Sequence, residues 1–152
     1  MATDQATTAK AKTQQATQMV LSGLKHIPDD KLGWVPMGKA KTPLLIVVEC
    51  AAVYKWLVSE FQGESNPGLY EELMKAEYSG RDEVVALLEE AQAELDAAMD
   101  ALTEENLAEA REVFWGPTTV GELLWAARMH SDYHAGQLNY IQTLLGDDEM
   151  HM

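Results

Sequence analysis

The spacing of apolar residues along the chain predicts four long helices separated by polar connectors. The first is expected over Asp4–Lys25 and the third over 81–102, where apolar residues recur every three or four positions. The second, over 42–63, coincides with an apolar run of about 20 residues without a turn signal. Such a run favours a buried helix, although "LLIVV" alone would suit a strand. The fourth helix is expected over 119–146.

Local signals support the expected helix ends. Pro43 stands at a first helical position, where its missing N–H costs nothing. Thr119 opens a T-x-x-E capping box, and Gly146 suits the residue just past a helix end. Two connectors are each expected to hold a short helix, over 68–78 and within "TEENLAEAREVFWGPT", where the Gly-Pro pair would break it.

Helices of this number and length predict an all-α fold, a four-helix bundle with long connections. The chain of 152 residues is most simply a single domain, and no internal repeat divides it. Residues 1–8 and 147–152 are expected to be frayed ends. Bundles of this kind often pair through a helix face, so we expect a homodimer.

Composition narrows the class of partners. A net charge of −14 disfavours nucleic acid, whose binding depends on Lys and Arg contacts to phosphate. The single cysteine excludes an internal disulfide and fits a reducing compartment. The polar N-terminus has no apolar segment, so we expect no signal sequence, and no stretch reaches the roughly 20 apolar residues that cross a bilayer. We therefore expect a cytoplasmic protein that binds neither nucleic acid nor membrane.

Candidate chemistry begins with Glu49, the one charged residue in the apolar stretch "LLIVVECAAVY". If the stripe that contains Leu45, Ala52 and Trp56 faces the core, the Glu49 carboxylate lies inside the bundle. An unpaired buried carboxylate costs several kcal/mol, so this residue needs a partner. A metal ion is one solution; a solvent-facing gap or a crossing lysine is another.

Two histidines in the last expected helix offer such a partner. His130 and His134 lie four residues apart within an apolar stripe, so both imidazoles project from one face. Together with Glu49 they form a ligand set suited to a divalent ion, Zn or Ni foremost, with Fe(II) also compatible. The alternative is a structural bundle in which the three side chains only hydrogen-bond to one another.

Three further residues lie near the expected site. Gln137 follows His134 by three positions and could orient a ligand or a water, or serve only as a packing amide. Tyr133 could donate a proton or a hydrogen bond beside the site. Cys50 is about 100° around the helix from Glu49, and we interpret it as an inert buried thiol.

The stretch "MHSDYHAGQLNYIQTLLG" resembles the last helix of the DinB/YfiT-like metal-binding four-helix bundles, which carries H-x-x-x-H followed by G-Q. His130, His134, Gly136 and Gln137 match that motif. Upstream, "TPLLIVVE" is similar to the family's T-P-L-x-x-x-x-H, with Glu49 in place of the histidine. The resemblance extends from about residue 34 to residue 146.

The resemblance implies a metal-dependent enzyme of the thiol-dependent S-transferase, isomerase or hydrolase type. It further implies a small-molecule substrate, a low-molecular-weight thiol as possible cosubstrate, and catalytic help from Tyr133 and Gln137. The sequence has "YHAGQ" where the family often has "HHRGQ", so an arginine that could anchor an anionic substrate is missing. The alternatives are a non-catalytic metal-binding or small-ligand-binding bundle and a structural bundle without metal.

Overall fold

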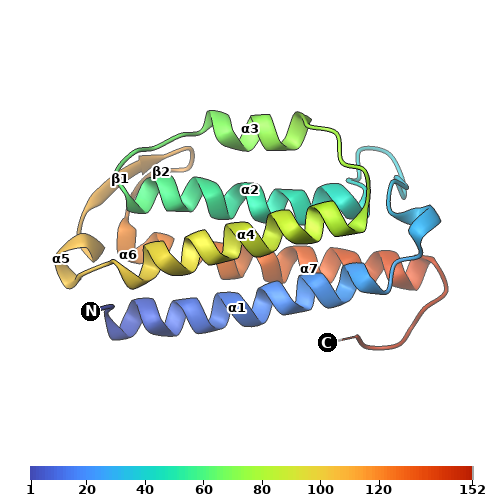
Figure 1. The fold of residues 1–152 in the computed structure, drawn as a ribbon, viewed down its shortest axis with the longest axis horizontal. Helices are drawn as coiled ribbons and strands as arrows, with labels where there is room; N and C mark the ends of the chain where they lie inside the picture. Colours follow the sequence, from blue (N-terminus) through green and yellow to red (C-terminus); the bar gives the residue numbers. More distant parts are fainter. Residues whose placement is uncertain (152) are drawn as a thin grey trace.

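Four long helices lie side by side along the length of the molecule (Figure 1). The computed structural model describes residues 1–151. The long helices are α1 (Asp4–Lys25), α2 (Pro43–Phe61), α4 (Arg81–Asp100) and α7 (Ala126–Leu144). α2 and α4 run in one direction, whereas α1 and α7 run in the other (Figure 1).

Shorter elements connect these helices. They are the 3-10 turn η1 (Asp29–Lys31), the helices α3 (Gly68–Lys75), α5 (Glu104–Leu107) and α6 (Val120–Leu123), and the strands β1 (Ala110–Val113) and β2 (Gly116–Thr119). Because α2 and α4 are parallel, the chain must travel back along the molecule between them. α3 lies on that return path and packs against α2.

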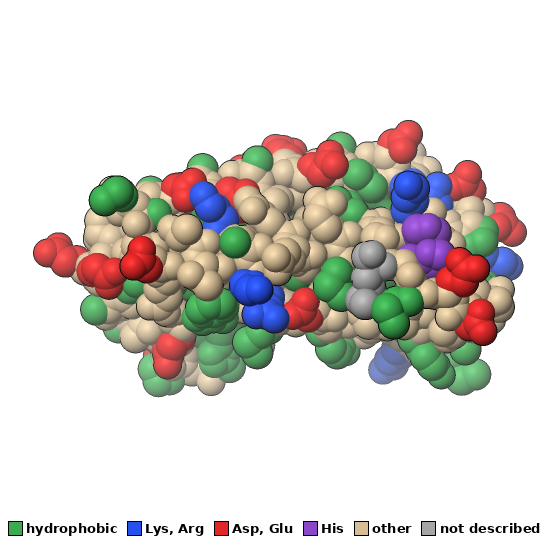
Figure 2. Space-filling view, turned by 90° about the horizontal axis from the view of Figure 1, so that it is seen from below, with side chains coloured by type: hydrophobic (Ala, Val, Ile, Leu, Met, Phe, Trp, Pro, Cys, Tyr) green, Lys and Arg blue, Asp and Glu red, His purple; other side chains and the backbone are tan. Residues whose placement is uncertain are grey.

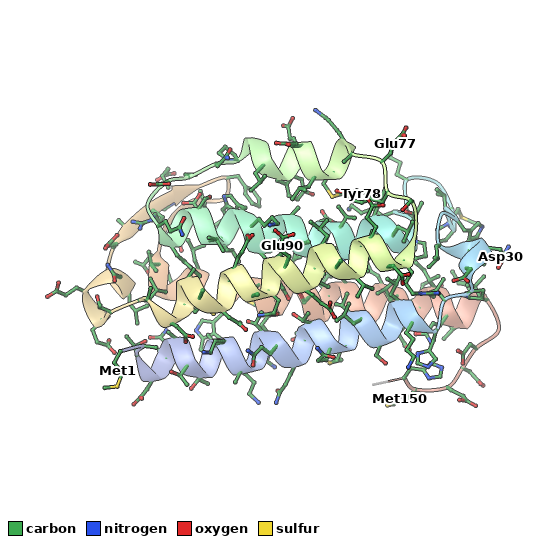
Figure 3. The ribbon with its side chains drawn as sticks, viewed as in Figure 1. Met1, Asp30, Glu77, Tyr78, Glu90 and Met150 are labelled. Carbon is green, nitrogen blue, oxygen red and sulfur yellow. The ribbon has the colours of Figure 1, made fainter. Side chains whose placement is uncertain are left out.

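α2 is the most enclosed helix because α1, α3, α4 and α7 all contact it. Thr42 caps its N-terminus by accepting a hydrogen bond from the Leu45 N–H, and Pro43 occupies its first turn, as predicted. Lys55 of α2 reaches Glu94 and Glu90 of α4 at 2.8 and 3.5 Å. Glu90 is labelled in Figure 3. None of the described helices has both the length and the apolar character to cross a membrane.

The all-α class predicted from the sequence is confirmed, and three of the four long helices match their expected ranges closely. The Thr119 capping box is present, and Gly146 adopts a φ of +90° just beyond α7, which favours glycine. The last helix differs from the prediction. It is interrupted at residues 124–125, so α6 and α7 replace one continuous helix.

A β-hairpin stands where the second short helix was expected to continue. Only α5 is helical; β1 and β2 then pair antiparallel, with Ala110 opposite Thr119 and Val113 opposite Gly116. The turn ends at Gly116, whose φ of +115° is one that other residues rarely adopt. Arg111 of β1 donates to the Glu60 carbonyl at 2.7 Å, which ties the hairpin to the C-terminal end of α2.

The chain ends are more ordered than the sequence suggested. Thr3 caps α1 by accepting from the Ala6 N–H at 3.0 Å, and Ala6 is 1% exposed, so the first turn of α1 packs against the molecule within the range expected to fray. At the other end, the ring of His151 stacks on that of His26 with centroids 3.5 Å apart. Figure 2 shows histidine side chains gathered at this end of the molecule. Residue 152, part of the expected frayed tail, lies outside the described residues.

A chain of buried hydroxyl groups joins three of the long helices. The Tyr54 hydroxyl of α2 lies 2.7 Å from Thr17 Oγ1 of α1 and 2.6 Å from Ser131 Oγ of α7. All three side chains are at most 2% exposed. Each hydroxyl therefore depends on its neighbours for hydrogen bonds, because water does not reach them.

Removing the central hydroxyl should destabilise the protein. We expect Tyr54→Phe to lower the free energy of unfolding by about 1–3 kcal/mol, because Thr17 and Ser131 each lose a buried partner. Tyr140→Phe is the matched control, since Tyr140 is 65% exposed, and it should change stability by less than about 0.5 kcal/mol. Urea unfolding followed by circular dichroism measures both values; equal stabilities would contradict a structural role for the hydroxyl chain.

Candidate metal site

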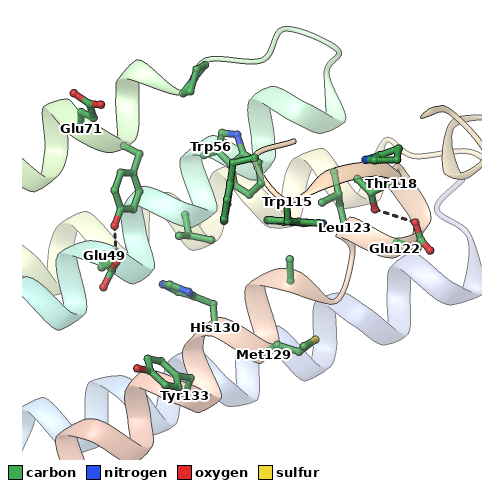
Figure 4. Close-up of a pocket in the computed structure, with 16 residues that line it drawn as sticks. Glu49, Trp56, Glu71, Trp115, Thr118, Glu122, Leu123, Met129, His130 and Tyr133 are labelled. Carbon is green, nitrogen blue, oxygen red and sulfur yellow. Dashed lines mark hydrogen bonds between the residues drawn. The ribbon is translucent and has the colours of Figure 1, made fainter. Parts of the chain in front are cut away.

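The candidate site lies between the facing sides of α2 and α7. Glu49 projects from α2, and His130 and His134 project from α7, one helical turn apart. Figure 4 shows Glu49 and His130 pointing from opposite helices into the same space. The helical spacing thus places all three predicted ligands at one interface.

Glu49 is buried yet charged. The residue is 7% exposed, its Oε1 accepts a hydrogen bond from the Tyr70 hydroxyl of α3, and its Oε2 lies 3.0 Å from Lys41 Nζ. Oε2 also lies 3.0 Å from His134 Nε2. Burial alone would raise the pKa of Glu49, but His134, Tyr70 and Lys41 together outweigh it and lower the pKa to about 2. The carboxylate is therefore ionised at neutral pH.

His134 is held with one nitrogen toward the site. The side chain is 1% exposed, and its Nδ1 lies 2.7 Å from Gln137 Oε1. Because an amide oxygen can only accept, Nδ1 carries the proton and donates to Gln137. That leaves Nε2, 3.0 Å from Glu49 Oε2, as the nitrogen that faces the site, where it can share a proton with the carboxylate or bind a metal in place of that proton. Gln137 thus orients His134, which is the role that a supporting residue has around a metal.

His130 lies beside His134, and its own imidazole is neutral at pH 7. The two rings have centroids 4.4 Å apart in a nearly perpendicular arrangement. Burial, and then the neighbouring His134, lower the pKa of His130 to about 4. The imidazole therefore has a free lone pair at neutral pH, as a metal ligand requires.

Three buried atoms at this site lack a hydrogen-bond partner. Within residues 1–151, these are Glu49 Oε2, His130 Nε2 and His134 Nε2. The 3.0 Å contacts of Glu49 Oε2 with His134 and Lys41 are close, but neither has the alignment of a hydrogen bond. Buried polar atoms are rarely left without a partner in folded proteins. A carboxylate oxygen and two imidazole nitrogens are also a donor set that divalent metals bind, so the residues fit such an ion.

Cys50 comes closer to this site than the sequence suggested. One ligand atom each from Cys50, His130 and His134 lie within 4.8 Å of one another, and Glu49 does not belong to this group. The Cys50 thiol is fully buried, and that burial raises its pKa to about 12. It is therefore protonated at neutral pH, whereas a metal ligand must be a thiolate. Adjacent helix positions 49 and 50 thus offer one ionised and one protonated candidate.

A cavity of about 980 Å³ opens beside the site. Glu49 and His130 line it, together with Tyr70 from α3 and aromatic side chains of α2 and the hairpin turn (Figure 4). Tyr133 lines the cavity as well; it is 64% exposed, and its ring centroid lies 5.2 Å from that of His134. A small molecule in this cavity would lie within reach of the candidate ligands.

Two contributors were not identified from the sequence. Tyr70 reaches Glu49 from the connector between α2 and α4, and Lys41 reaches it from the segment before α2. Neither residue lies in the helix that carries Glu49, so the periodic pattern of that helix could not reveal them. A crossing lysine is one alternative explanation for Glu49, and the structure supplies a lysine, Lys41, from the segment just before α2.

Comparison with solved structures supports the fold. A conserved protein from Enterococcus faecalis has a TM-score of 0.77 at 16% identity, over 93% of this chain and 97% of that one. A DinB-like protein from Bacillus subtilis has a TM-score of 0.72 at 17% identity, over 95% and 96%. An uncharacterised protein from Clostridium difficile 630 has a TM-score of 0.72 at 14% identity, over 95% and 99%.

Sequence comparison gives the family. None of the curated proteins compared matches the chain significantly. The sequence pattern of the DinB superfamily, in contrast, matches residues 11–138, which include the candidate site and most of the four long helices. The resemblance noted from the motifs on α2 and α7 is therefore confirmed, and the chain belongs to the DinB superfamily.

Proposed function

We propose that the protein binds one divalent metal ion through Glu49, His130 and His134. The observation that carries this proposal is that each of these three side chains has a buried atom without a hydrogen-bond partner; among the described residues only Arg81 Nε, outside the site, is in the same position. An ion between them would satisfy a charged oxygen and two neutral nitrogens at once. Zn and Ni suit this set best, and Fe(II) is compatible with it.

We further propose that the protein is a metal-dependent enzyme that acts on a small organic molecule. Three protein ligands leave a coordination position for substrate, which is typical of catalytic sites. When bound, the ion would supply Lewis acidity to a thiol, a water molecule or a carbonyl group there. Thiol S-transfer, isomerisation of a thiol adduct and hydrolysis are the reaction types that this chemistry and the family resemblance favour.

The chain's own residues have separate parts in this proposal. Gln137 fixes the tautomer of His134, and Tyr70 holds Glu49 in place. These are positioning roles. Tyr133, at the edge of the cavity, is the side chain placed to hold or deliver a proton to a bound molecule. The buried floor around Glu49 excludes bulk water, which strengthens each of these electrostatic contacts.

A second candidate is a bundle that functions without metal. The contact between Lys41 and Glu49 favours it, because a lysine already neutralises the buried carboxylate. In that case His130 and His134 would be structural. The first candidate accounts better for the two unpartnered imidazole nitrogens, which Lys41 does not contact.

Metal analysis tests the proposal directly. Protein purified without a histidine tag should contain about one divalent ion per chain by elemental mass spectrometry. His130→Ala should lose it, because one of three ligands is removed, whereas His26→Ala, a histidine outside the site, should retain it. Metal-free wild type, after exposure to Zn and Ni, would contradict the proposal.

Variants at two adjacent positions test which residue is the third metal ligand. Glu49→Gln should weaken metal binding by about 10-fold to 1,000-fold, because an ionised oxygen becomes a neutral amide. Cys50→Ser should bind normally, because in this proposal Glu49, already ionised, is the third ligand and Cys50 is not one. The opposite result would assign the ion to the group formed by Cys50, His130 and His134. Titration with a competing chelator measures both affinities.

The low pKa of His130 predicts an acid-sensitive fold. The pKa is about 4 in the folded protein and 6.5 in the unfolded chain, so the unfolded state binds the proton first as the pH falls. The free energy of unfolding of metal-free protein should thus fall between pH 6.5 and pH 4, by up to about 3 kcal/mol. His130→Ala should lose this part of the dependence, and His26→Ala should keep it. Urea unfolding at a series of pH values provides the measurement.

Activity assays distinguish an enzyme from a protein that only binds metal. Low-molecular-weight thiols and a set of electrophiles are offered to metal-loaded protein and to protein stripped with a chelator. Turnover that requires metal and falls at least about 10-fold in Tyr133→Phe would support the enzyme. Stoichiometric metal without turnover would instead support a non-catalytic metal-binding protein.

The homodimer expected from the sequence stays a prediction. Away from the cavity, α7 exposes Tyr140 and Leu144, four residues apart on one side, and a second copy could cover them. Sedimentation should then give a mass near twice 16.8 kDa. A monomer mass at micromolar concentration would overturn it.

A further inference from the structure

The outer part of the cavity has a wall of three aromatic rings. Trp56 of α2 meets Trp115 of the hairpin turn with centroids 5.9 Å apart and Phe114 at 6.4 Å. Phe114 and Trp115 meet each other at 4.7 Å, nearly perpendicular. Phe114 is 91% exposed and Trp115 is 52% exposed, although both line the cavity. Large apolar surface kept open in a concave site is typical of ligand binding.

A buried carboxylate holds this wall in place. Trp56 Nε1 donates to Glu60 Oε1 at 2.9 Å, and Ser65 donates to the same oxygen. Glu60 is 2% exposed. Arg111 of β1 binds the Glu60 carbonyl and so fixes the hairpin relative to Trp56. The wall is therefore built on supported backbone and a fixed indole ring, which reduces the entropy lost when a ligand binds.

The charged side chains that line the cavity are all acidic. Of the described residues that line it, none is Lys or Arg, whereas three are glutamates: Glu49, Glu71 and Glu122. Lys41 and Lys75 neutralise the first two. Glu122 is bound only by hydroxyl and amide donors at the start of α6, so its charge is not compensated. An anion entering the cavity would meet this carboxylate and a chain of net charge −14.

We propose that the cavity selects an uncharged apolar organic molecule, with its flat apolar body against Trp56, Phe114 and Trp115 and its polar end toward His130. The selection against anions comes from the missing basic side chains and from Glu122. This inference takes from the proposed function only that the cavity is the substrate site. The aromatic wall itself needs no metal.

A pair of fluorescent probes tests the selection. N-Phenyl-1-naphthylamine is uncharged, and 8-anilino-1-naphthalenesulfonate has the same aromatic body with an added sulfonate. We expect the uncharged probe to bind at one site at least about 10-fold more tightly than the sulfonate in chelator-treated protein, where no ion adds positive charge to the cavity. Equal or tighter binding of the sulfonate would overturn the proposal.

Variants test where the probe binds and which side chains set the preference for an uncharged molecule. Trp115→Ala should weaken binding of the uncharged probe by about 5-fold to 20-fold, because one ring of the wall is lost. Met37→Ala, at an exposed methionine away from the cavity, should leave this affinity unchanged. Met129 lines the cavity and is 68% exposed, so Met129→Lys adds a positive charge there with little effect on folding. It should bind the sulfonate at least about fivefold more tightly than wild type does, and Met37→Lys should not.

The outcomes separate this inference from the proposed function. Unchanged binding in Trp115→Ala, or an equal gain in both lysine variants, would overturn the selection whatever the metal analysis shows. Conversely, protein without metal that keeps the tenfold preference and both variant effects would retain the cavity's selectivity and lose the metal proposal.

Discussion

The charge on Glu49 is the interaction on which the site depends. A carboxylate that is 7% exposed stays ionised only because its surroundings supply positive charge and donors. These come from three separate parts of the chain: Lys41 before α2, Tyr70 of α3 and His134 of α7. Glu49 thereby links the connector, the crossover helix and the last long helix to α2. The proposed metal would use this arrangement, which the fold already maintains.

Much of the frame could be predicted from the sequence because it depends on periodic burial. The stripe of α7 placed His130 and His134 on one face, and the run of α2 placed Glu49 inside, as the structure shows. The capping box at Thr119 could also be predicted, because the residues that form it lie within four positions of one another. These features follow from local geometry, which a sequence pattern reports directly.

What could not be predicted depends on contacts between distant segments. β1 and β2 have four residues each, too few for an alternating pattern, and their hairpin is fixed through the contact of Arg111 with the end of α2. The order of the first residues follows from the cap at Thr3 and from the burial of Ala6. The approach of Cys50 to the two histidines depends on how α2 rotates against α7, and residue spacing alone does not give that rotation.

The direction of the helices has a consequence for how such a site could diversify. Since α2 and α4 are parallel, some segment must cross the molecule between them, and α3 does so directly over α2. The topology requires α3 only as a crossing segment, but α3 also covers Glu49 and binds it through Tyr70. None of the residues of α3 is fully buried, and Leu73 and Met74 pack against the core, so changes at its other positions need not disturb the packing of the four long helices. Substitutions within these eight residues could therefore change which molecule a relative of this fold binds, while the four long helices stay as they are.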